Sequence, residues 1–255
     1  MDNTLIKLIG YMAMVLHGDA AVFDRWRWLR KYLKSGSLRT LDAGCGSGAF
    51  TMYAAKIGNE AVGISFDERN NKIAAGRAKI LEISNINFID GDLRKLDEMF
   101  QVLGKFDQII CFETIEHILG DSKLLKDFSF LLKPGGRLLL TAPYKYYKHL
   151  YGDDKTKLST YEDGGHVRWG YTHEEIKNLL NKFDFEIESA GYISGYASQR
   201  LINLQRIIGR INPKLAWLVV FPLRIFQFLD PILAKIIKYP SLSIGIVAVK
   251  NNINK

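Results

Sequence analysis

The chain has 255 residues, 47% of them hydrophobic, with 35 basic and 27 acidic side chains and a net charge of +8. This length and apolar content predict one sizeable domain with a full core. Its two cysteines, Cys45 and Cys111, exclude a disulfide framework and indicate a reducing, cytoplasmic compartment, and no cysteine or histidine spacing indicates a metal site.

Residues 1–36 are expected to form N-terminal helices. The apolar stretch from Leu8 to Leu16 lacks a basic leader and runs directly into a charged, Trp-containing segment. It therefore predicts a helix rather than a signal peptide. From Asp19 to Lys34 apolar residues recur at helical spacing, which predicts a helix that flanks the core.

The decapeptide LDAGCGSGAF, residues 41–50, is the most informative stretch and predicts a strand, a glycine turn and a helix. Three glycines within five positions let the backbone turn tightly and leave no side chain between the main chain and a ligand. Asp42, at the strand end, is an acceptor directed into the same crevice. A phosphate would require only N–H donors there, so the acid favours a ligand that carries an ammonium group.

Gly44, Gly46 and Ala49 also fit the dinucleotide fingerprint Gly-x-Gly-x-x-Gly/Ala. That fingerprint requires an acid about 20 residues later, at the end of the second strand, to hold a ribose hydroxyl. Ser65 stands at that place, after a strand expected at 61–64, and Asp67 follows two residues later. We take Asp67 as the ribose-binding acid; the alternative is a helix N-terminal acid that complements the macrodipole.

Three segments downstream decide between these interpretations. Residues 87–93 predict a strand that ends in Asp90-Gly91-Asp92, residues 106–112 a fourth strand, and residues 131–140 a helix end, a Pro-Gly-Gly turn and a fifth strand. With the glycine turn, this order over residues 38–142 resembles the Rossmann-like (class I) S-adenosylmethionine-dependent methyltransferases that act on small molecules. An NAD-dependent oxidoreductase is the distant alternative.

The resemblance implies S-adenosylmethionine as cofactor, bound by a core at residues 37–142. In that family the acid before a Leu accepts a hydrogen bond from the adenine amino group, and Asp92 matches its position. The donor-binding residues implied are Asp42, Gly44, Cys45, Gly46, Gly48, Ser65, Asp67, Asp92, Leu93 and Phe112.

The alternation of strands and helices predicts an α/β fold with a parallel sheet and right-handed crossovers. Thr172 and Glu175 have the capping-box spacing, so a helix is expected from there to about Lys182. The resemblance implies a seven-stranded sheet with helices on both faces and an antiparallel last strand, here expected at 241–250. The other strands are expected at 38–41, 61–64, 86–89, 106–111, 137–141 and from 185.

Residues 143–172 join strand five to its helix at the carboxyl edge of the sheet, where open α/β sheets bind ligands, and are the predicted substrate loop. Transfer to a hydroxyl gains from a base tuned near neutral pH. His166 is the candidate base and His117 the second candidate; the alternative for His166 is a loop histidine that packs on Trp169. The predicted acceptor-binding residues are Tyr144, Tyr147, His149, Arg168 and Trp169, with a surface ion pair as the alternative role of Arg168.

The charge is concentrated near the end of the chain. Residues 195–255 hold nine Lys/Arg and one acid, which leaves 26 of each sign in residues 1–194. The basic residues alternate with Leu, Ile, Phe and Trp across an insert at 195–240, a pattern that suits a lipid surface or an amphiphile better than nucleic acid. Its apolar run is interrupted by charges and too short to span a bilayer, so 200–238 is expected to be a membrane anchor, a lid or a dimer interface.

The sequence thus predicts a single-domain enzyme that methylates a small, hydrophobic or lipid-like acceptor, with O-methylation favoured. From a different class, the alternative is a catalytically silent S-adenosylmethionine-fold binding module. The two differ in whether a base lines the methyl end of the donor site.

Overall fold

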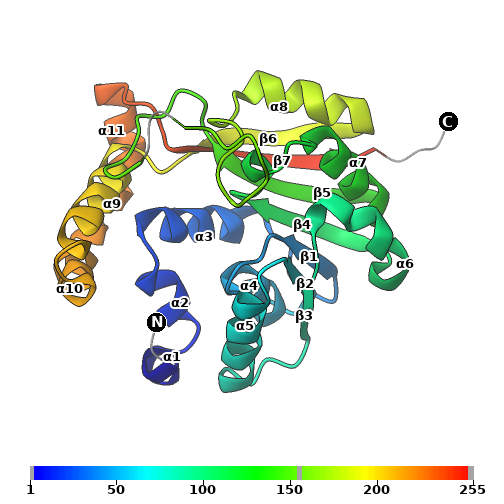
Figure 1. Ribbon diagram of the computed structural model, residues 1–255, viewed down its shortest axis with the longest axis horizontal. Helices are drawn as coiled ribbons and strands as arrows, with labels where there is room; N and C mark the ends of the chain where they lie inside the picture. Colours follow the sequence, from blue (N-terminus) through cyan, green and yellow to red (C-terminus); the bar gives the residue numbers. More distant parts are fainter. Residues whose placement is uncertain (1–2, 154–156, 252–255) are drawn as a thin grey trace.

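The computed structural model describes residues 3–153 and 157–251, and its centre is a seven-stranded sheet with helices on both faces (Figure 1). The strand order is β3-β2-β1-β4-β5-β7-β6, and β7 runs antiparallel to both of its neighbours while β1 to β5 pair in parallel. The predicted Rossmann-like fold is confirmed. The strands are β1 (Arg39–Ala43), β2 (Glu60–Ser65), β3 (Ile86–Asp90), β4 (Phe106–Phe112), β5 (Leu132–Pro143), β6 (Phe185–Ile193) and β7 (Ser243–Lys250).

The core lies on both faces of β4, whose apolar run is typical of a strand covered on both sides. Ile109 belongs to a cluster with α7 (Asp121–Leu131) and α8 (His173–Leu180), whereas its neighbour Ile110 belongs to one with α3 (Ala20–Tyr32) and α4 (Ala49–Lys56). Successive strand residues point to opposite faces, so this alternation assigns the helices to two layers. The remaining core helices are α5 (Glu68–Ile80) and α6 (Phe100–Leu103), with 3₁₀ turns η1 (Leu93–Met99), η2 (Ile115–His117) and η3 (Asn181–Phe183).

Two predicted boundaries differ from the structure. The fifth strand begins at Leu132 rather than near residue 137, because Leu132 pairs with Phe106 before the Pro-Gly-Gly segment. The expected N-terminal helix over 8–16 is divided into α1 (Asn3–Ile9) and α2 (Met12–His17) around Gly10, whose φ is +62°. The capping box is present as predicted, since the Thr172 hydroxyl accepts from the Glu175 N–H and the Glu175 carboxylate accepts from the Thr172 N–H.

The insert between β6 and β7 is helical: α9 (Tyr196–Gly209), α10 (Pro213–Leu223), η4 (Arg224–Leu229) and α11 (Asp230–Ile237). These helices stand beyond α3 at one end of the molecule (Figure 1). Buried polar groups attach them to the N-terminal helices. Arg224 Nη1 donates to the Leu16 carbonyl at 2.8 Å, and Gln227 Nε2 donates to the Ala20 carbonyl at 2.9 Å. The insert is therefore packed against the domain along one face.

A second attachment is made through buried carboxylates. Asp230 accepts from the N–H groups of Gly195, Ala197 and Ser198 and so caps α9. The Ser198 hydroxyl oxygen lies 2.6 Å from Asp24 Oδ2, on α3, and 2.7 Å from Asp230 Oδ2. Burial raises the pKa of Asp24 to about 6, with a smaller contribution from the neighbouring Asp230 charge.

The raised pKa of Asp24 predicts a pH-dependent stability. The folded chain binds the Asp24 proton more tightly than the unfolded chain, so this stabilisation is complete below pH 4 and is lost as the pH rises through 6. As the pH rises from 4.5 to 7.5, the wild type should lose this stabilisation and Asp24→Asn should not. The free energy of unfolding of the variant should therefore rise by about 2 kcal/mol relative to that of the wild type. The measurement is urea unfolding of both chains at each pH. The pKa of Asp42 is also raised, in the wild type and the variant alike, so only the difference between their free energies of unfolding reports on Asp24. The prediction is contradicted if the two free energies change in parallel with pH.

Candidate functional site

A cavity of about 300 Å³ lies where β1, β2, β3 and β4 end. The strand order reverses between β1 and β4, and open α/β sheets bind ligands in the crevice at such a switch point. We call it the first cavity. It is lined by Gly44, Gly46, Ser65, Phe66, Asp67, Asn70, Gly91, Asp92, Leu93, Arg94, Glu113, Thr114, His117, Ile118, Glu162 and Gly164.

The glycine turn uses its residues in two ways. Gly46 has a φ of +50°, and a Cβ added there would meet no atom within 4 Å, so the bare backbone faces open space. Gly48 has a φ of +81°, and its Cβ would lie 2.9 Å from Ala74 and Phe88. Gly46 thus leaves room for a ligand, whereas Gly48 lets the segment after the turn pack against α5 and β3.

The carboxylates predicted for the donor site lie around this cavity. Asp67 lines it and also caps α5, since its Oδ1 accepts from the Arg69 N–H at 3.0 Å; the cap is observed, and ribose binding by Asp67 stays a prediction. Asp92 and Leu93 line the wall after β3, and Ser65 lines the wall after β2. Phe66, which the sequence analysis missed, is 76% exposed at the same place and offers an aromatic face to a ligand.

Three predicted donor contacts are placed elsewhere. Asp42 is 2% exposed and lies under the turn, where its Oδ2 accepts from the Thr51 hydroxyl at 2.6 Å and burial raises its pKa to about 6. The buried Cys45 thiol contacts the Asn71 side chain, and burial raises its pKa. Phe112 packs on Phe50 and Trp28, with ring centroids 5.0 and 5.7 Å apart. These three side chains support the turn from behind rather than line the cavity.

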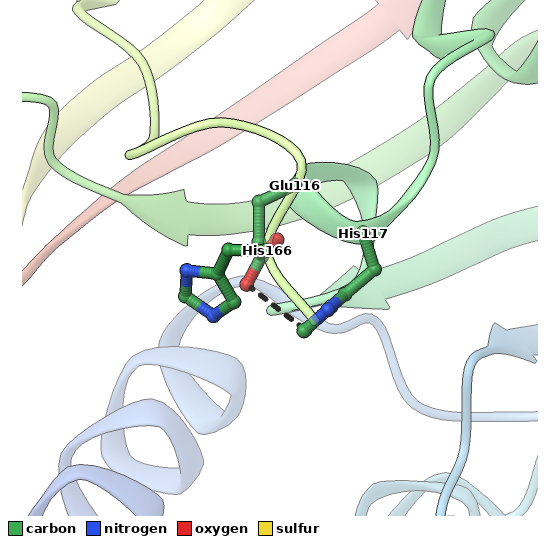
Figure 2. A group of neighbouring side chains, drawn as sticks. All are labelled: Glu116, His117 and His166. Carbon is green, nitrogen blue, oxygen red and sulfur yellow. Dashed lines mark ion pairs between the residues drawn. The ribbon is translucent and has the colours of Figure 1, made fainter. Parts of the chain in front are cut away.

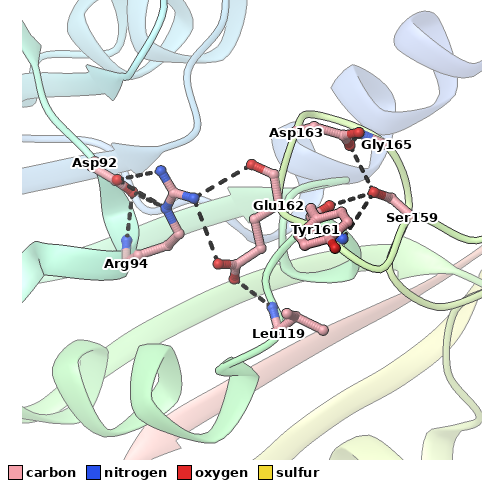
Figure 3. A network of polar contacts seen from close by, with 8 residues as sticks. All are labelled: Asp92, Arg94, Leu119, Ser159, Tyr161, Glu162, Asp163 and Gly165. Carbon is pink, nitrogen blue, oxygen red and sulfur yellow. Dashed lines mark hydrogen bonds and ion pairs between the residues drawn. The ribbon is translucent and has the colours of Figure 1, made fainter.

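Arg94 joins the first cavity to the substrate loop (Figure 3). Its Nε donates to both oxygens of Asp92 at 2.8 Å, which holds the pKa of Asp92 below its usual value. Arg94 Nη1 lies 3.5 Å from Glu162 Oε2, and Glu162 Oε1 accepts from the Leu119 N–H at 2.6 Å. The loop around Glu162 therefore closes one side of the cavity.

A second cavity, of about 380 Å³, adjoins the first, and Glu113 lines both. Its walls come from α3, β5, the substrate loop and α9. It is lined by Asp19, Ala21, Arg25, Glu113, Pro143, Tyr147, Leu150, Asp153, Lys157, His166, Trp169, Ile202, Arg206 and Leu242.

Three residues predicted to meet the acceptor, Tyr147, His166 and Trp169, line this second cavity. Burial raises the pKa of Tyr147 to about 12, so its phenol stays protonated at neutral pH. His149 packs behind them, 5.0 Å from the Tyr147 ring and 4.8 Å from the Trp169 ring. Tyr144 lies apart from them, against Tyr146 and Tyr192.

Arg168 is not placed as predicted. Its Nη1 donates to the carbonyls of Ile115 and Ile118 at 3.1 and 2.8 Å, and Nη2 donates to the Leu119 carbonyl at 3.1 Å. Nη1 also lies 3.2 Å from Asp121 Oδ2. The guanidinium is thus used to fasten the substrate loop to η2, and its ion-pair partner is neither of the neighbouring acids Glu162 and Asp163.

Glu116, His117 and His166 converge where the two cavities meet (Figure 2). The His117 and His166 rings are perpendicular, with centroids 4.7 Å apart, and Glu116 Oε1 lies 3.9 Å from His117 Nε2. Burial, reinforced by the charge of His117, lowers the pKa of His166, so this imidazole is neutral at pH 7. A neutral imidazole at this junction can accept a proton or a cation.

The sequence analysis assigned no role to Glu113, which borders both cavities. Its φ is +47°, an uncommon conformation for a residue with a side chain, and its Oε2 lies 3.3 Å from Arg25 Nη1 and accepts from Ser243. Glu113 could have been found from the sequence, because it is an acid directly after the fourth strand. That strand neighbours β1 at the switch point, so a side chain at its end lies near the ligand crevice.

Comparison with known proteins agrees with this geometry. A family model described as a methyltransferase domain matches residues 34–184, more than half of the chain. The ubiquinone biosynthesis O-methyltransferase of Coxiella burnetii (strain RSA 493 / Nine Mile phase I) is 29% identical over 124 residues, 49% of this chain and 51% of that protein. The chain thus spans about half the length of such curated relatives.

Solved structures share the fold over most of the chain. An S-adenosylmethionine-dependent methyltransferase from Mesorhizobium loti superposes with a TM-score of 0.59 and 19% identity, covering 92% of this chain and 100% of that chain. The [4+2]-cyclase SpnF superposes with a TM-score of 0.59 and 18% identity, covering 89% and 80%. At these identities the likeness establishes the fold alone.

Proposed function

Since this chain belongs to the class I S-adenosylmethionine-dependent methyltransferase family, we propose that it methylates a hydroxyl of a small, apolar acceptor. The main support for the proposal is that the two cavities adjoin each other beside His117 and His166. His117 lines the first cavity and His166 lines the second, so donor and acceptor would meet beside the same pair of imidazoles.

The first cavity has the groups that the donor requires. Carboxylates follow β2 and β3, at Asp67 and Asp92, where they can accept from ribose hydroxyls and an amino group, and Phe66 and Leu93 add apolar surface. Gly46 leaves the turn open to the amino-acid part of the ligand. The bound sulfonium would supply the methyl group. The protein's own contribution is to align the two molecules and exclude water.

The second cavity supports an apolar acceptor with one polar end. Trp169, Leu150 and Ile202 supply apolar walls, and Glu113 and His166 stand toward the donor side. A hydroxyl directed at the cluster could lose its proton to His166, because a neutral imidazole is a suitable base near pH 7. The relatives named for ubiquinone biosynthesis favour O-methylation and an apolar substrate.

Donor binding is tested by calorimetry with S-adenosylhomocysteine. Asp67→Ala should weaken binding about tenfold or more, since it removes a carboxylate that lines the cavity. Glu68→Ala is the matched control, because this neighbouring acid pairs with Lys72 on the helix surface. NAD binding without affinity for S-adenosylhomocysteine would overturn the donor assignment.

Proton removal is tested with His166→Ala. Turnover should fall by about 10²-fold or more while the affinity for S-adenosylhomocysteine stays nearly unchanged. His149→Ala is the control, since this ring packs behind Tyr147 and Trp169. Full turnover in His166→Ala would reduce His166 to a packing residue.

A catalytically silent binding module is the second candidate, because the fold is shared by a protein named for a reaction other than methyl transfer and so does not by itself fix the chemistry. It would bind S-adenosylhomocysteine with the same dependence on Asp67. It would release none of it from S-adenosylmethionine with any acceptor. Product formation therefore separates the two candidates where binding does not.

We also propose that the insert attaches the protein to an anionic membrane surface. Contrary to the expectation that the apolar run is too short, Pro213–Ile237 is long and apolar enough to cross a bilayer by length and composition, because the helical segment continues past the charged residues, with a mean hydropathy of 1.5 over its best window. The segment comprises α10, η4 and α11 in succession, and Arg224 and Gln227 bond to the N-terminal helices. These bonds favour a segment that lies on the surface.

The exposed face of this segment is apolar with a basic border. Leu218, Ile225, Ile232 and Ile236 recur at helical spacing and are 65%, 67%, 57% and 72% exposed. In α10 the buried residues are Ala216 and Val220, each two positions from Leu218 and so on the other side of the helix. The exposed cations Arg210, Lys214, Lys235 and Lys238 flank them, and each would contribute on the order of 1 kcal/mol near anionic lipid.

Vesicle co-sedimentation tests this attachment. The wild type should bind vesicles that contain phosphatidylglycerol, and binding should weaken with salt and fall about tenfold or more in Leu218→Glu/Ile225→Glu. Val102→Glu is the control, since Val102 is 82% exposed on α6. Absence of lipid binding, with dimers in light scattering that the double variant abolishes, would make this face a dimer interface instead.

A further inference from the structure

We propose that a cavity behind the glycine turn binds the phosphate group of an anionic ligand, with the headgroup of a membrane phospholipid as the favoured source. This cavity, of about 320 Å³, is called the rear cavity. The choice of a lipid rests on the membrane attachment proposed above, whereas the phosphate site itself does not. The rear cavity is lined by Met14, His17, Gly18, Val22, Cys45, Ser47, Ala49, Phe50 and Arg77.

The rear cavity is separate from the candidate donor site. Gly44 and Gly46 of the glycine turn line the first cavity, whereas Cys45 and Ser47 line the rear cavity, and the two cavities share no lining residue. The first cavity has four acidic residues in its walls, and the rear cavity has none. An anion in the rear cavity would therefore meet no like charge in the residues that line it.

Arg77 supplies a buried positive charge at this cavity. It is 9% exposed, its Nη1 donates to the Ser47 carbonyl at 3.1 Å, and its buried Nε has no hydrogen-bond partner among the described residues. Burial lowers the pKa of the guanidinium, and no neighbouring carboxylate opposes this shift. A buried charge without a counterion is costly, and a guanidinium with free donors matches the geometry of a phosphate.

The start of α4 supplies backbone donors to the same cavity. Gly48 precedes this helix and provides no side-chain cap, and the N–H groups of Ala49 and Phe50 have no hydrogen-bond partner in the described part of the chain. Both residues line the rear cavity. Free N–H groups at the positive end of a helix dipole favour a phosphate, and here they stand beside the Arg77 guanidinium.

His17 connects the rear cavity to the insert. Its ring lines the cavity and stacks on Trp217 of α10, with centroids 6.4 Å apart. Trp217 Nε1 donates to the Leu16 carbonyl at 3.1 Å, which fixes α10 beside the cavity. Partial burial lowers the pKa of His17, with contributions from positive charges that include Arg77. A bound anion would offset this repulsion between cations.

The apolar face of α10 favours a phospholipid over a soluble phosphate. Leu218 is 65% exposed and Phe221 is 38% exposed, and the Phe221 ring stacks on Trp217 with centroids 4.8 Å apart. A lipid whose phosphate occupied the rear cavity would have this face available for its acyl chains. A soluble phosphate would use the cavity and leave the face bare.

The phosphate site is tested on the full chain by calorimetry with inorganic phosphate, at an ionic strength held constant with chloride. Binding should be saturable, and Arg77→Met should weaken it about tenfold or more. Lys79→Met is the matched control, because it removes the same charge from the exposed surface of α5. His17→Ala changes an exposed position, should weaken binding about threefold or more, and keeps the site testable if Arg77→Met does not fold.

Three results would overturn the phosphate site. They are the absence of saturable phosphate binding, phosphate binding that Arg77→Met leaves unchanged in a folded protein, and competition between phosphate and S-adenosylhomocysteine. Competition would place the anion in the donor site. S-adenosylhomocysteine should bind Arg77→Met as it binds the wild type, so the donor assignment and the phosphate site can fail independently.

Vesicle co-sedimentation identifies the source of the phosphate. The wild type should bind vesicles that contain phosphatidylglycerol about tenfold more tightly than vesicles of equal charge that contain oleate, which has no phosphate, and Arg77→Met should abolish this preference. Equal binding to both vesicles, with phosphate binding retained, would overturn the lipid source and assign the site to a soluble phosphate. Phosphate binding without any vesicle binding would remove the membrane attachment and leave the site.

Discussion

The clamp made by Arg168 is the contact on which the site depends. One guanidinium holds the carbonyls of Ile115, Ile118 and Leu119 and reaches the Asp121 carboxylate, so it ties the substrate loop to the segment after β4. The Ile115 carbonyl also accepts from the Ile118 N–H, and the guanidinium, which has several donors, satisfies the carbonyls at the exit of this 3₁₀ turn together. The neighbouring His166 is thereby held beside Glu116 and His117. The two cavities border each other because of this attachment.

The junction brings two carboxyl groups together in a protein whose net charge is +8. Glu113 and Glu116 are adjacent in the fold, and burial, with the Glu113 charge added, raises the pKa of Glu116 well above its usual range. Arg25 from α3 offsets Glu113, whereas the Glu116 oxygens have no hydrogen-bond partner among the described residues and lie 3.9 Å from His117 Nε2 at the nearest. Sites of chemistry often retain groups of this kind, since stability alone would select against them.

The insert shows how a strongly apolar segment can be held at the protein surface. Its inner face carries Arg224 and Gln227, which bond to backbone carbonyls at the end of α2 and the start of α3. Its cap, Asp230, meets Asp24 through the Ser198 hydroxyl. These polar contacts fix the orientation, so the apolar residues between them face outward as a group. Another helix of the insert, α9, contributes Ile202 and Arg206 to the second cavity, which places the exposed face and that cavity on one structural unit.

The sequence by itself determined the fold and the location of the first cavity, the candidate donor site. Apolar strand runs, the glycine turn and the capping box are local signals, and they led to the sheet, the switch point and the positions of Asp67 and Asp92. Asp42 and Phe112 could not be judged in this way, because whether a side chain at a strand end faces a cavity or the core depends on what packs beside it.

Only the tertiary structure decided how the loop residues are used. His117 and His166 were each chosen as a base from residue type, but nothing local shows that residues 49 positions apart share a site with Glu116. Arg168 was likewise predicted to contact the substrate. Its main partners are backbone carbonyls, and such partners cannot be recognised from residue types in the sequence. Sequence periodicity reports which face of an element is buried, whereas a site is made by contacts between elements that only chain folding brings together.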